Sequence, residues 1–111
     1  MPSESLAEFE LLVMLAALRL GPDEAYTVSI AEDIRRRTGR FVRRANVYTT
    51  LQRLEQKGLI SSALGEARPE RGGRPPRLVT VEAAGLDAVR ATTGAIHAML
   101  GGLGDMLGEA R

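Results

Sequence analysis

The 111-residue sequence predicts a mostly α-helical fold with one small β-hairpin. Apolar residues recur at the spacing of an amphipathic helix in four stretches of the chain. Two shorter stretches with β-branched or alternating apolar residues flank a long loop that is rich in glycine and proline, as in a hairpin. Apolar residues make up 44% of the chain and charged residues 26%, which is typical of a folded globular protein.

The first two predicted helices cover Leu6 to Leu20 and about Thr27 to Arg37. The first has so wide an apolar face that it should be buried on several sides. Gly21-Pro22-Asp23 ends this helix, because proline lacks a backbone donor and the triplet favours a turn. Thr38-Gly39 ends the second helix, and we expect Phe41-Val42 to form a short buried connector.

The third predicted helix, Ala45 to Gly58, has one apolar and one polar face. Val47, Leu51 and Leu54 follow one another at i, i+4 and i+7, which places them on one side of a helix. The pattern alone suits an ordinary surface helix as well as a helix that enters the major groove of DNA. The polar face carries hydrogen-bonding side chains, namely Asn46, Thr49, Gln52, Arg53 and Gln56, with Tyr48 at its edge.

Two short strands are predicted at Leu59 to Leu64 and Arg77 to Val81. The loop between them, residues 65–76, contains Gly72-Gly73 and three prolines, so it is too long and irregular for a tight turn. Such a loop is either a solubilising loop or a wing that contacts the DNA backbone or minor groove. Its place beside the third helix favours a wing, whose arginines are Arg68, Arg71 and Arg74.

The last predicted helix begins after Glu82, and its apolar residues alternate by three and four positions in a heptad seam. So small a domain cannot easily cover this seam, so we expect it to pack against a second copy of the chain. Packing on the first helix alone is the alternative. Each glycine in the helix interior costs ~1 kcal/mol relative to alanine, so we expect regular helix to about Leu100. The residues predicted for dimerisation are Leu86, Val89, Thr93, Ile96, Leu100 and Leu103.

Positive charge is concentrated in the middle of the chain, although the net charge is only +1. Residues 35–77 hold twelve Lys and Arg against three acidic residues, whereas the rest holds three against eleven. A merely solvated surface would mix the two signs, so the segregation favours a surface that approaches a polyanion. On such a surface we expect phosphate contacts from Arg43, Arg44, Arg71 and Arg74, and base contacts from Asn46, Thr49, Gln52 and Arg53.

Other classes of function find no support in the sequence. The chain has no cysteine and a single histidine, His97, while Glu8 and Glu10 do not face each other on a helix. Glu32-Asp33 is interpreted as a pair of ordinary surface charges. We therefore expect no enzyme activity, no metal and no cofactor. The start lacks a secretion signal and the longest apolar run is far below the ~20 residues of a membrane span, which favours a cytoplasmic protein.

Five segments between Phe9 and Arg77 resemble the short type of PadR-like winged-helix transcriptional regulators. They are FELLVMLAALRLG (Phe9 to Gly21), AYTVSI (Ala25 to Ile30), RTGR (Arg37 to Arg40), VYTTLQRLEQKGLI (Val47 to Ile60) and PERGGRPPR (Pro69 to Arg77). The resemblance implies a homodimer whose last helices pack on each other and on the first helices, and which binds a palindromic operator, usually as a repressor. On the matching motifs, the resemblance assigns DNA contacts to Tyr48, Thr49 and Arg53 in the helix and to Arg71 and Arg74 in the wing.

The chain departs from the family pattern in two places. It has Leu78 and Val79 where the family commonly has aromatic residues, and Glu82-Ala83 where the family commonly has Thr-Pro. Glutamate caps a helix less well than threonine, because its longer side chain does not easily reach the first free amides. The sequence therefore allows two starting points for that helix, one turn apart. Some relatives bind flat aromatic drugs between the paired last helices through tryptophan, which this chain lacks.

The sequence thus predicts a winged helix-turn-helix DNA-binding domain at residues 1–81 and a C-terminal dimerisation helix at residues 82–111. The favoured hypothesis is a homodimeric repressor that binds double-stranded DNA at a palindromic operator. One alternative is a sensor whose small apolar effector binds at the dimer seam near Ile96, Met99 and Leu100. The other is a winged-helix protein-interaction module without DNA binding, against which the segregated charge argues.

Overall fold

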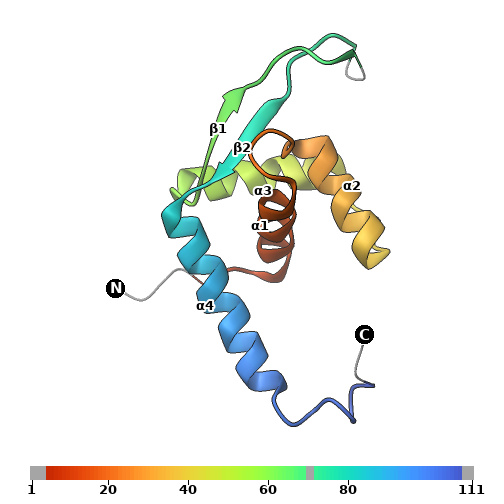
Figure 1. Ribbon diagram of the computed structural model, residues 1–111, viewed down its shortest axis with the longest axis vertical. Helices are drawn as coiled ribbons and strands as arrows, with labels where there is room; N and C mark the ends of the chain where they lie inside the picture. Colours follow the sequence, from red (N-terminus) through yellow and green to blue (C-terminus); the bar gives the residue numbers. More distant parts are fainter. Residues whose placement is uncertain (1–4, 70–71, 109–111) are drawn as a thin grey trace.

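The computed structural model describes residues 5–69 and 72–108, and it confirms the predicted fold class (Figure 1). Every predicted helix and strand is present, with small differences at the ends. None of the helices in these two ranges is long and apolar enough to cross a membrane. In chain order the elements are α1 (Glu8–Leu20), α2 (Thr27–Thr38), α3 (Arg44–Gln56), β1 (Ile60–Leu64), β2 (Arg77–Val81) and α4 (Ala83–Leu100).

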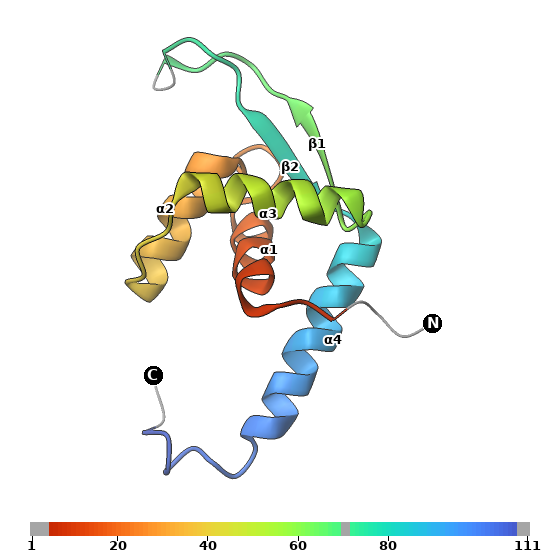
Figure 2. The same cartoon turned by 180° about the vertical axis from the view of Figure 1, so that it is seen from behind.

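Helix α1 lies in the middle of the fold, in contact with α2, α3, β2 and α4 (Figures 1 and 2). Its Val13 and Met14 are completely buried, and the elements around it add Ile30, Val47 and Leu54 to the same core. Burial of an apolar side chain of this size stabilises a fold by about 1.5–3 kcal/mol relative to exposure. The wide apolar face predicted for the first helix is therefore covered largely by the chain's own elements.

Strands β1 and β2 form an antiparallel hairpin, in which Ile60 lies opposite Val81 and Leu64 lies opposite Arg77. The Val79 amide donates a 2.8 Å hydrogen bond to the carbonyl of Ala25, which lies between α1 and α2. The hairpin rises past α3, and its long loop extends beyond the helices (Figure 1). The base of the hairpin is thus tied to the helical core, while the loop lies away from it.

Helix α4 begins at Ala83, and its N-cap residue Glu82 makes no side-chain capping hydrogen bond. The Glu82 carboxylate instead accepts a 2.6 Å hydrogen bond from the Ser61 hydroxyl in β1. Gly85 lets α4 approach the start of the hairpin, because a Cβ at this position would lie 2.1 Å from the Leu59 carbonyl oxygen. The contact between α4 and the hairpin therefore depends on glycine at position 85.

The first half of α4 packs against its own chain, and the second half projects into solvent (Figures 1 and 2). Ala88, Val89 and Thr92 are buried, whereas residues 94–100 are exposed. The Leu6 amide donates a buried 3.0 Å hydrogen bond to the Thr92 hydroxyl, which fastens the segment before α1 to α4. The helix ends at Leu100, as predicted.

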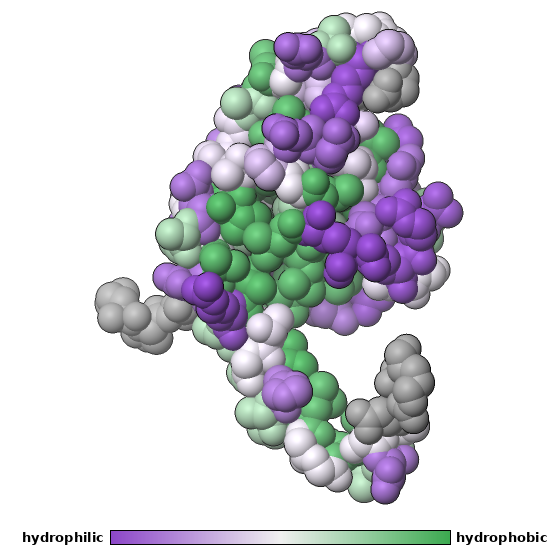
Figure 3. Space-filling view, viewed as in Figure 1, coloured by the Kyte–Doolittle hydropathy of each residue, from purple (hydrophilic) through white to green (hydrophobic). Residues whose placement is uncertain are grey.

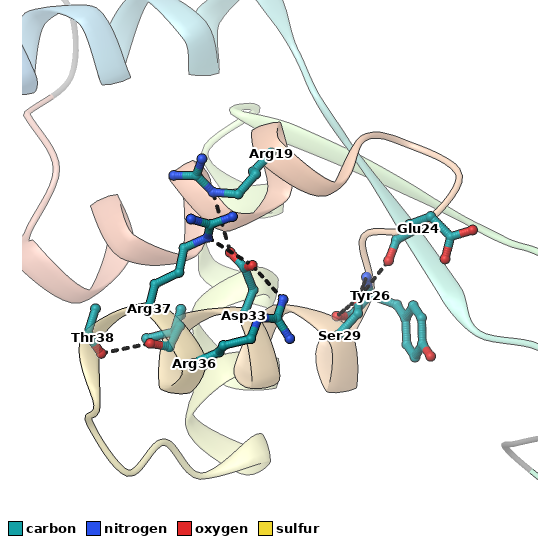
Figure 4. A network of polar contacts seen from close by, with 9 residues as sticks. Arg19, Glu24, Tyr26, Ser29, Asp33, Arg36, Arg37 and Thr38 are labelled. Carbon is teal, nitrogen blue, oxygen red and sulfur yellow. Dashed lines mark hydrogen bonds and ion pairs between the residues drawn. The ribbon is translucent and has the colours of Figure 1, made fainter.

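Two predictions about individual side chains were wrong. Phe41 is 80% exposed rather than buried, because Val42 takes the position against the core, and the Arg43 guanidinium lies 5.8 Å from the centre of the Phe41 ring. Asp33 is only 2% exposed rather than a surface charge. Its burial is compensated by ion pairs with three arginines, namely Arg19, Arg36 and Arg37 (Figure 4).

Candidate nucleic-acid interface

Helix α3 turns one face to the core and the other to solvent. Val47, Leu51 and Leu54 are buried, as the apolar spacing predicted. After the helix, Gly58 has a φ of 78°, a conformation that favours glycine, and the Leu59 amide donates a 3.0 Å hydrogen bond back to the Leu54 carbonyl. In Figure 2, α3 crosses the front of the molecule between α2 and the hairpin. Its polar face is therefore open to a large partner.

The polar side chains of α3 fall into two groups, on either side of the helix. Asn46, Thr49 and Arg53 line a groove between α3 and the start of α1. Tyr48 and Gln52 line a second groove, between α3 and the hairpin. The predicted base-contacting residues therefore flank the outermost edge of α3 on both sides rather than forming a single row.

Several of these side chains are oriented by contacts within the chain. The Thr49 hydroxyl donates a 3.0 Å hydrogen bond to the Ala45 carbonyl in the preceding turn. The Gln52 amide lies 3.4 Å from the Tyr48 hydroxyl, which accepts its hydrogen bond. Tyr48 itself is 54% exposed, so its ring remains accessible beside this pair. The geometry leaves polar groups of each residue at the surface of α3.

Three of the arginines predicted to contact phosphate lie in the described part of the chain, before α3 and in the hairpin loop. Arg43 and Arg44 are exposed at the N-terminus of α3, and Arg43 is the N-cap residue of the helix. Arg74 is exposed in the hairpin loop. Arg71, which was predicted to act with Arg74, lies outside the described residues. The described arginines thus place positive charge before α3 and along the hairpin.

Arg68 has a structural role that the sequence did not indicate. Its guanidinium donates hydrogen bonds to the Glu24 carboxylate at 3.2 Å and to the Asp23 carbonyl at 2.8 Å. It also lies 5.5 Å from the centre of the Tyr26 ring. These contacts pin the start of the hairpin loop to the turn between α1 and α2, so Arg68 serves to hold the loop.

Glu10 is the second residue that sequence analysis missed. It lines the groove between α1 and α3 and is only 6% exposed. Burial raises the pKa of Glu10 and is the largest single influence. It is outweighed by hydrogen bonds from the Ala7 amide and Lys57 and by the charges of Lys57 and Arg53, so the pKa lies below its ordinary value. Glu10 lies three residues before Val13, so helical spacing places it on the buried face of α1. This spacing was the sequence signal that could have indicated its burial.

The residues predicted for dimerisation do not share one environment. Val89 is buried in the chain's own core, and Leu86 and Thr93 are half-buried. Ile96 and Leu100 are 46% and 47% exposed on the projecting half of α4. Leu103 is half-buried just beyond the helix. In Figure 3, apolar surface continues from the middle of the molecule along α4, whereas hydrophilic surface gathers over α2.

Several solved structures of similar fold are transcriptional regulators. A PadR family transcriptional regulator from Eggerthella lenta is 24% identical, with a TM-score of 0.66 over 90% of this chain and 86% of that chain. A PadR-like transcriptional regulator from Bacillus cereus is 15% identical, with a TM-score of 0.69 over 90% of this chain and 94% of that chain. A PadR-like transcription factor from Bacteroides fragilis is 21% identical, with a TM-score of 0.61 over 91% of this chain and 87% of that chain.

The sequence itself matches no protein-family model and no curated protein. The structural likeness nevertheless covers at least 90% of this chain and at least 86% of the other chain in each of these comparisons. The chain therefore has the winged helix-turn-helix fold of the PadR-like transcriptional regulators, the family that its sequence motifs resemble.

Proposed function

We propose that the protein is a sequence-specific DNA-binding transcriptional regulator that acts as a homodimeric repressor on a palindromic operator. The observation that carries this proposal is the open polar face of α3, with exposed arginines at both ends of the surface. Arg43 and Arg44 precede the helix, and Arg74 lies in the hairpin loop. The similar structures from Eggerthella lenta and Bacillus cereus are transcriptional regulators, which supports the same function.

The chemistry of the exposed groups suits double-stranded DNA. An α-helix fits the major groove, where asparagine pairs with adenine and arginine with guanine through two hydrogen bonds. Asn46 and Arg53 are the α3 residues with these side chains. Arg43, Arg44 and Arg74 would neutralise phosphates and release counterions, which supplies affinity without sequence preference. We therefore assign base contacts to α3 and backbone contacts to the flanking arginines, with Arg71 as a further wing residue.

The exposed apolar half of α4 supports a homodimer. Ile96, Met99 and Leu100 are exposed by 46%, 78% and 47%. An apolar surface of this kind on a projecting helix is typical of an interaction site. A two-fold contact through α4 would present two α3 helices to half-sites about 10 bp apart, or a multiple of one DNA turn.

Fluorescence anisotropy on duplexes tests this function. The protein should bind a random-sequence duplex with an affinity that falls steeply with salt, and should bind duplexes selected from genomic DNA more tightly at the same salt concentration. Sedimentation should give twice the mass of one chain. Absence of salt-dependent duplex binding would instead favour a protein-interaction module.

A second candidate function is that of a sensor for a small apolar effector. The end of α4 and the turns after it form a hollow lined by His97, Leu100 and Leu107 together with glycines. An effector that binds there shifts DNA affinity only if it binds the two arrangements of α4 unequally. Thermal-shift screening of planar hydrophobic compounds tests this function, and a genuine effector must also change the affinity for DNA.

A further inference from the structure

We infer that Glu10 of α1 is a positioning residue that holds the Arg53 guanidinium and thereby sharpens the base preference of α3. The inference rests on the proposed function, since it concerns how Arg53 is aimed at DNA. It adds a residue from outside the helix-turn-helix to the determinants of sequence specificity.

The Glu10 carboxylate is fixed on both of its oxygens. Oε1 accepts a 2.9 Å hydrogen bond from the Ala7 amide, at the start of α1. Oε2 accepts a 3.2 Å hydrogen bond from Lys57 Nζ, at the end of α3. The side chain is only 7% exposed, so neighbouring atoms leave it little room to change rotamer. Glu10 is therefore a rigid acceptor that faces α3.

Arg53 reaches the same carboxylate from the polar face of α3. Its Nη1 lies 3.6 Å from Glu10 Oε2, which is an ion pair longer than a hydrogen bond. The Arg53 side chain is 48% exposed, and a guanidinium has five N–H donors in one plane. Glu10 can therefore restrict the orientation of the guanidinium while N–H groups remain for a base edge. Asn46 and Thr49 line the same groove, so the contact between Glu10 and Arg53 lies beside other predicted base-contacting groups.

The position of Glu10 is itself secured from α4. The Leu6 amide, next to Ala7, donates its buried hydrogen bond to Thr92 in the packed half of α4. A chain of contacts therefore runs from α4 through the segment before α1 to Glu10 and on to Arg53. The orientation of the Arg53 guanidinium thus depends on contacts with α1 and α4 as well as on α3.

The charge of Glu10 also limits contact with DNA in general. One carboxylate faces the two cations Arg53 and Lys57. Without it, the Arg53 guanidinium loses this ion pair, and a long flexible arginine binds the nearest phosphate as readily as a base. Loss of Glu10 should therefore raise affinity for any duplex and steepen its salt dependence, while lowering discrimination between bases.

The test is a selection from a pool of random double-stranded DNA, followed by anisotropy on the selected duplex and its single-base variants. Glu10→Gln, Arg53→Ala and the double variant are compared with the wild type. Glu8→Gln is the matched control, because it removes one charge from the same helix but frees Arg40, not Arg53. We expect Glu10→Gln to lose at least about threefold in discrimination at the one base position that Arg53→Ala affects, and Glu8→Gln to lose none. The double variant should discriminate no less than Arg53→Ala alone.

Each outcome decides the inference. A wild type that enriches no motif overturns sequence-specific binding and the inference together. A wild-type motif that Glu10→Gln leaves unchanged overturns the inference, while the proposed function stands. A loss spread over all base positions also overturns it, since that indicates a general disturbance of the fold. Glu10→Asp, which keeps the charge but shortens the reach by one methylene, should show the same localised loss if Glu10→Gln does not fold.

Discussion

The Leu6 amide and the Thr92 hydroxyl form a buried 3.0 Å hydrogen bond between residues at opposite ends of the chain. Leu6 itself is 6% exposed and Thr92 8% exposed. The contact closes the fold between the segment before α1 and the packed half of α4. Because both residues are buried, loss of this hydrogen bond should leave the Leu6 amide without a partner in the core and cost stability.

Thr92→Val should lower the free energy of unfolding by about 1–3 kcal/mol, because valine has the shape of threonine but leaves the buried Leu6 amide unpaired. Urea denaturation at one fixed protein concentration measures the change. Thr80→Val, on the exposed face of β2, is the control and should differ little from the wild type. Equal stability of Thr92→Val and Thr80→Val would show that the hydrogen bond contributes nothing net.

Gly85→Ala and Gly94→Ala should have opposite effects, although both lie inside α4. A Cβ at Gly85 would lie 2.1 Å from the Leu59 carbonyl oxygen, so α4 must shift, at a cost of about 1–3 kcal/mol. A Cβ at Gly94 meets no atom within 4 Å, so alanine should stabilise the helix by up to about 1 kcal/mol. Thermal unfolding of the two variants checks this pair, and a destabilised Gly94→Ala variant would contradict it.

Acidification should reduce the stabilisation that Glu10 provides. The pKa of Glu10 is lowered in the folded protein, so its contribution is fully present above the ordinary value of 4.5 and is lost as the pH falls through the lowered folded-state pKa. The difference in urea midpoint between wild type and Glu10→Gln should therefore shrink as the pH falls from 4.5 through the lowered pKa of Glu10 in the folded protein. A difference that stays constant on acidification would show that the carboxylate is not stabilised by its partners.

Substitution of Arg53 and Arg74 should separate base contacts from phosphate contacts. Arg53→Ala should cost about 1–3 kcal/mol at one base position of the operator. Arg74→Ala should weaken all duplexes alike and reduce the slope of log affinity against log salt by about 0.9. Anisotropy on selected and scrambled duplexes at several salt concentrations measures both, and the same loss for both variants on both duplexes would refute the division.

Ile96→Glu should weaken the proposed dimer, because it places a charge in the exposed apolar half of α4. Sedimentation at several protein concentrations should show a larger fraction of single chains, and operator affinity should fall with it. Leu64→Glu is the control, since Leu64 is 65% exposed on β1, away from α4. A dimer that tolerates glutamate at position 96 would place the contact elsewhere.

Local sequence rules were sufficient for the elements of this protein. The i, i+4, i+7 spacing of Val47, Leu51 and Leu54 specifies which face of α3 is buried, since helical geometry alone decides which side chains share a face. Gly58 and the proline-rich loop likewise mark the end of α3 and the length of the hairpin, because their backbone preferences are local. The helix-turn-helix, the hairpin and the end of α4 near Leu100 were predictable for this reason.

Tertiary structure decided the roles of the charged side chains. Asp33 and Glu10 occupy buried positions on their helices, and each is stable there because arginine or lysine from another element reaches it. Arg68 holds the hairpin loop instead of facing outward, and Val89 turned out to be core while Ile96 stayed exposed. Such pairings join residues far apart in the chain, and the free energy that selects them arises only when the packed elements bring the charges together and exclude water.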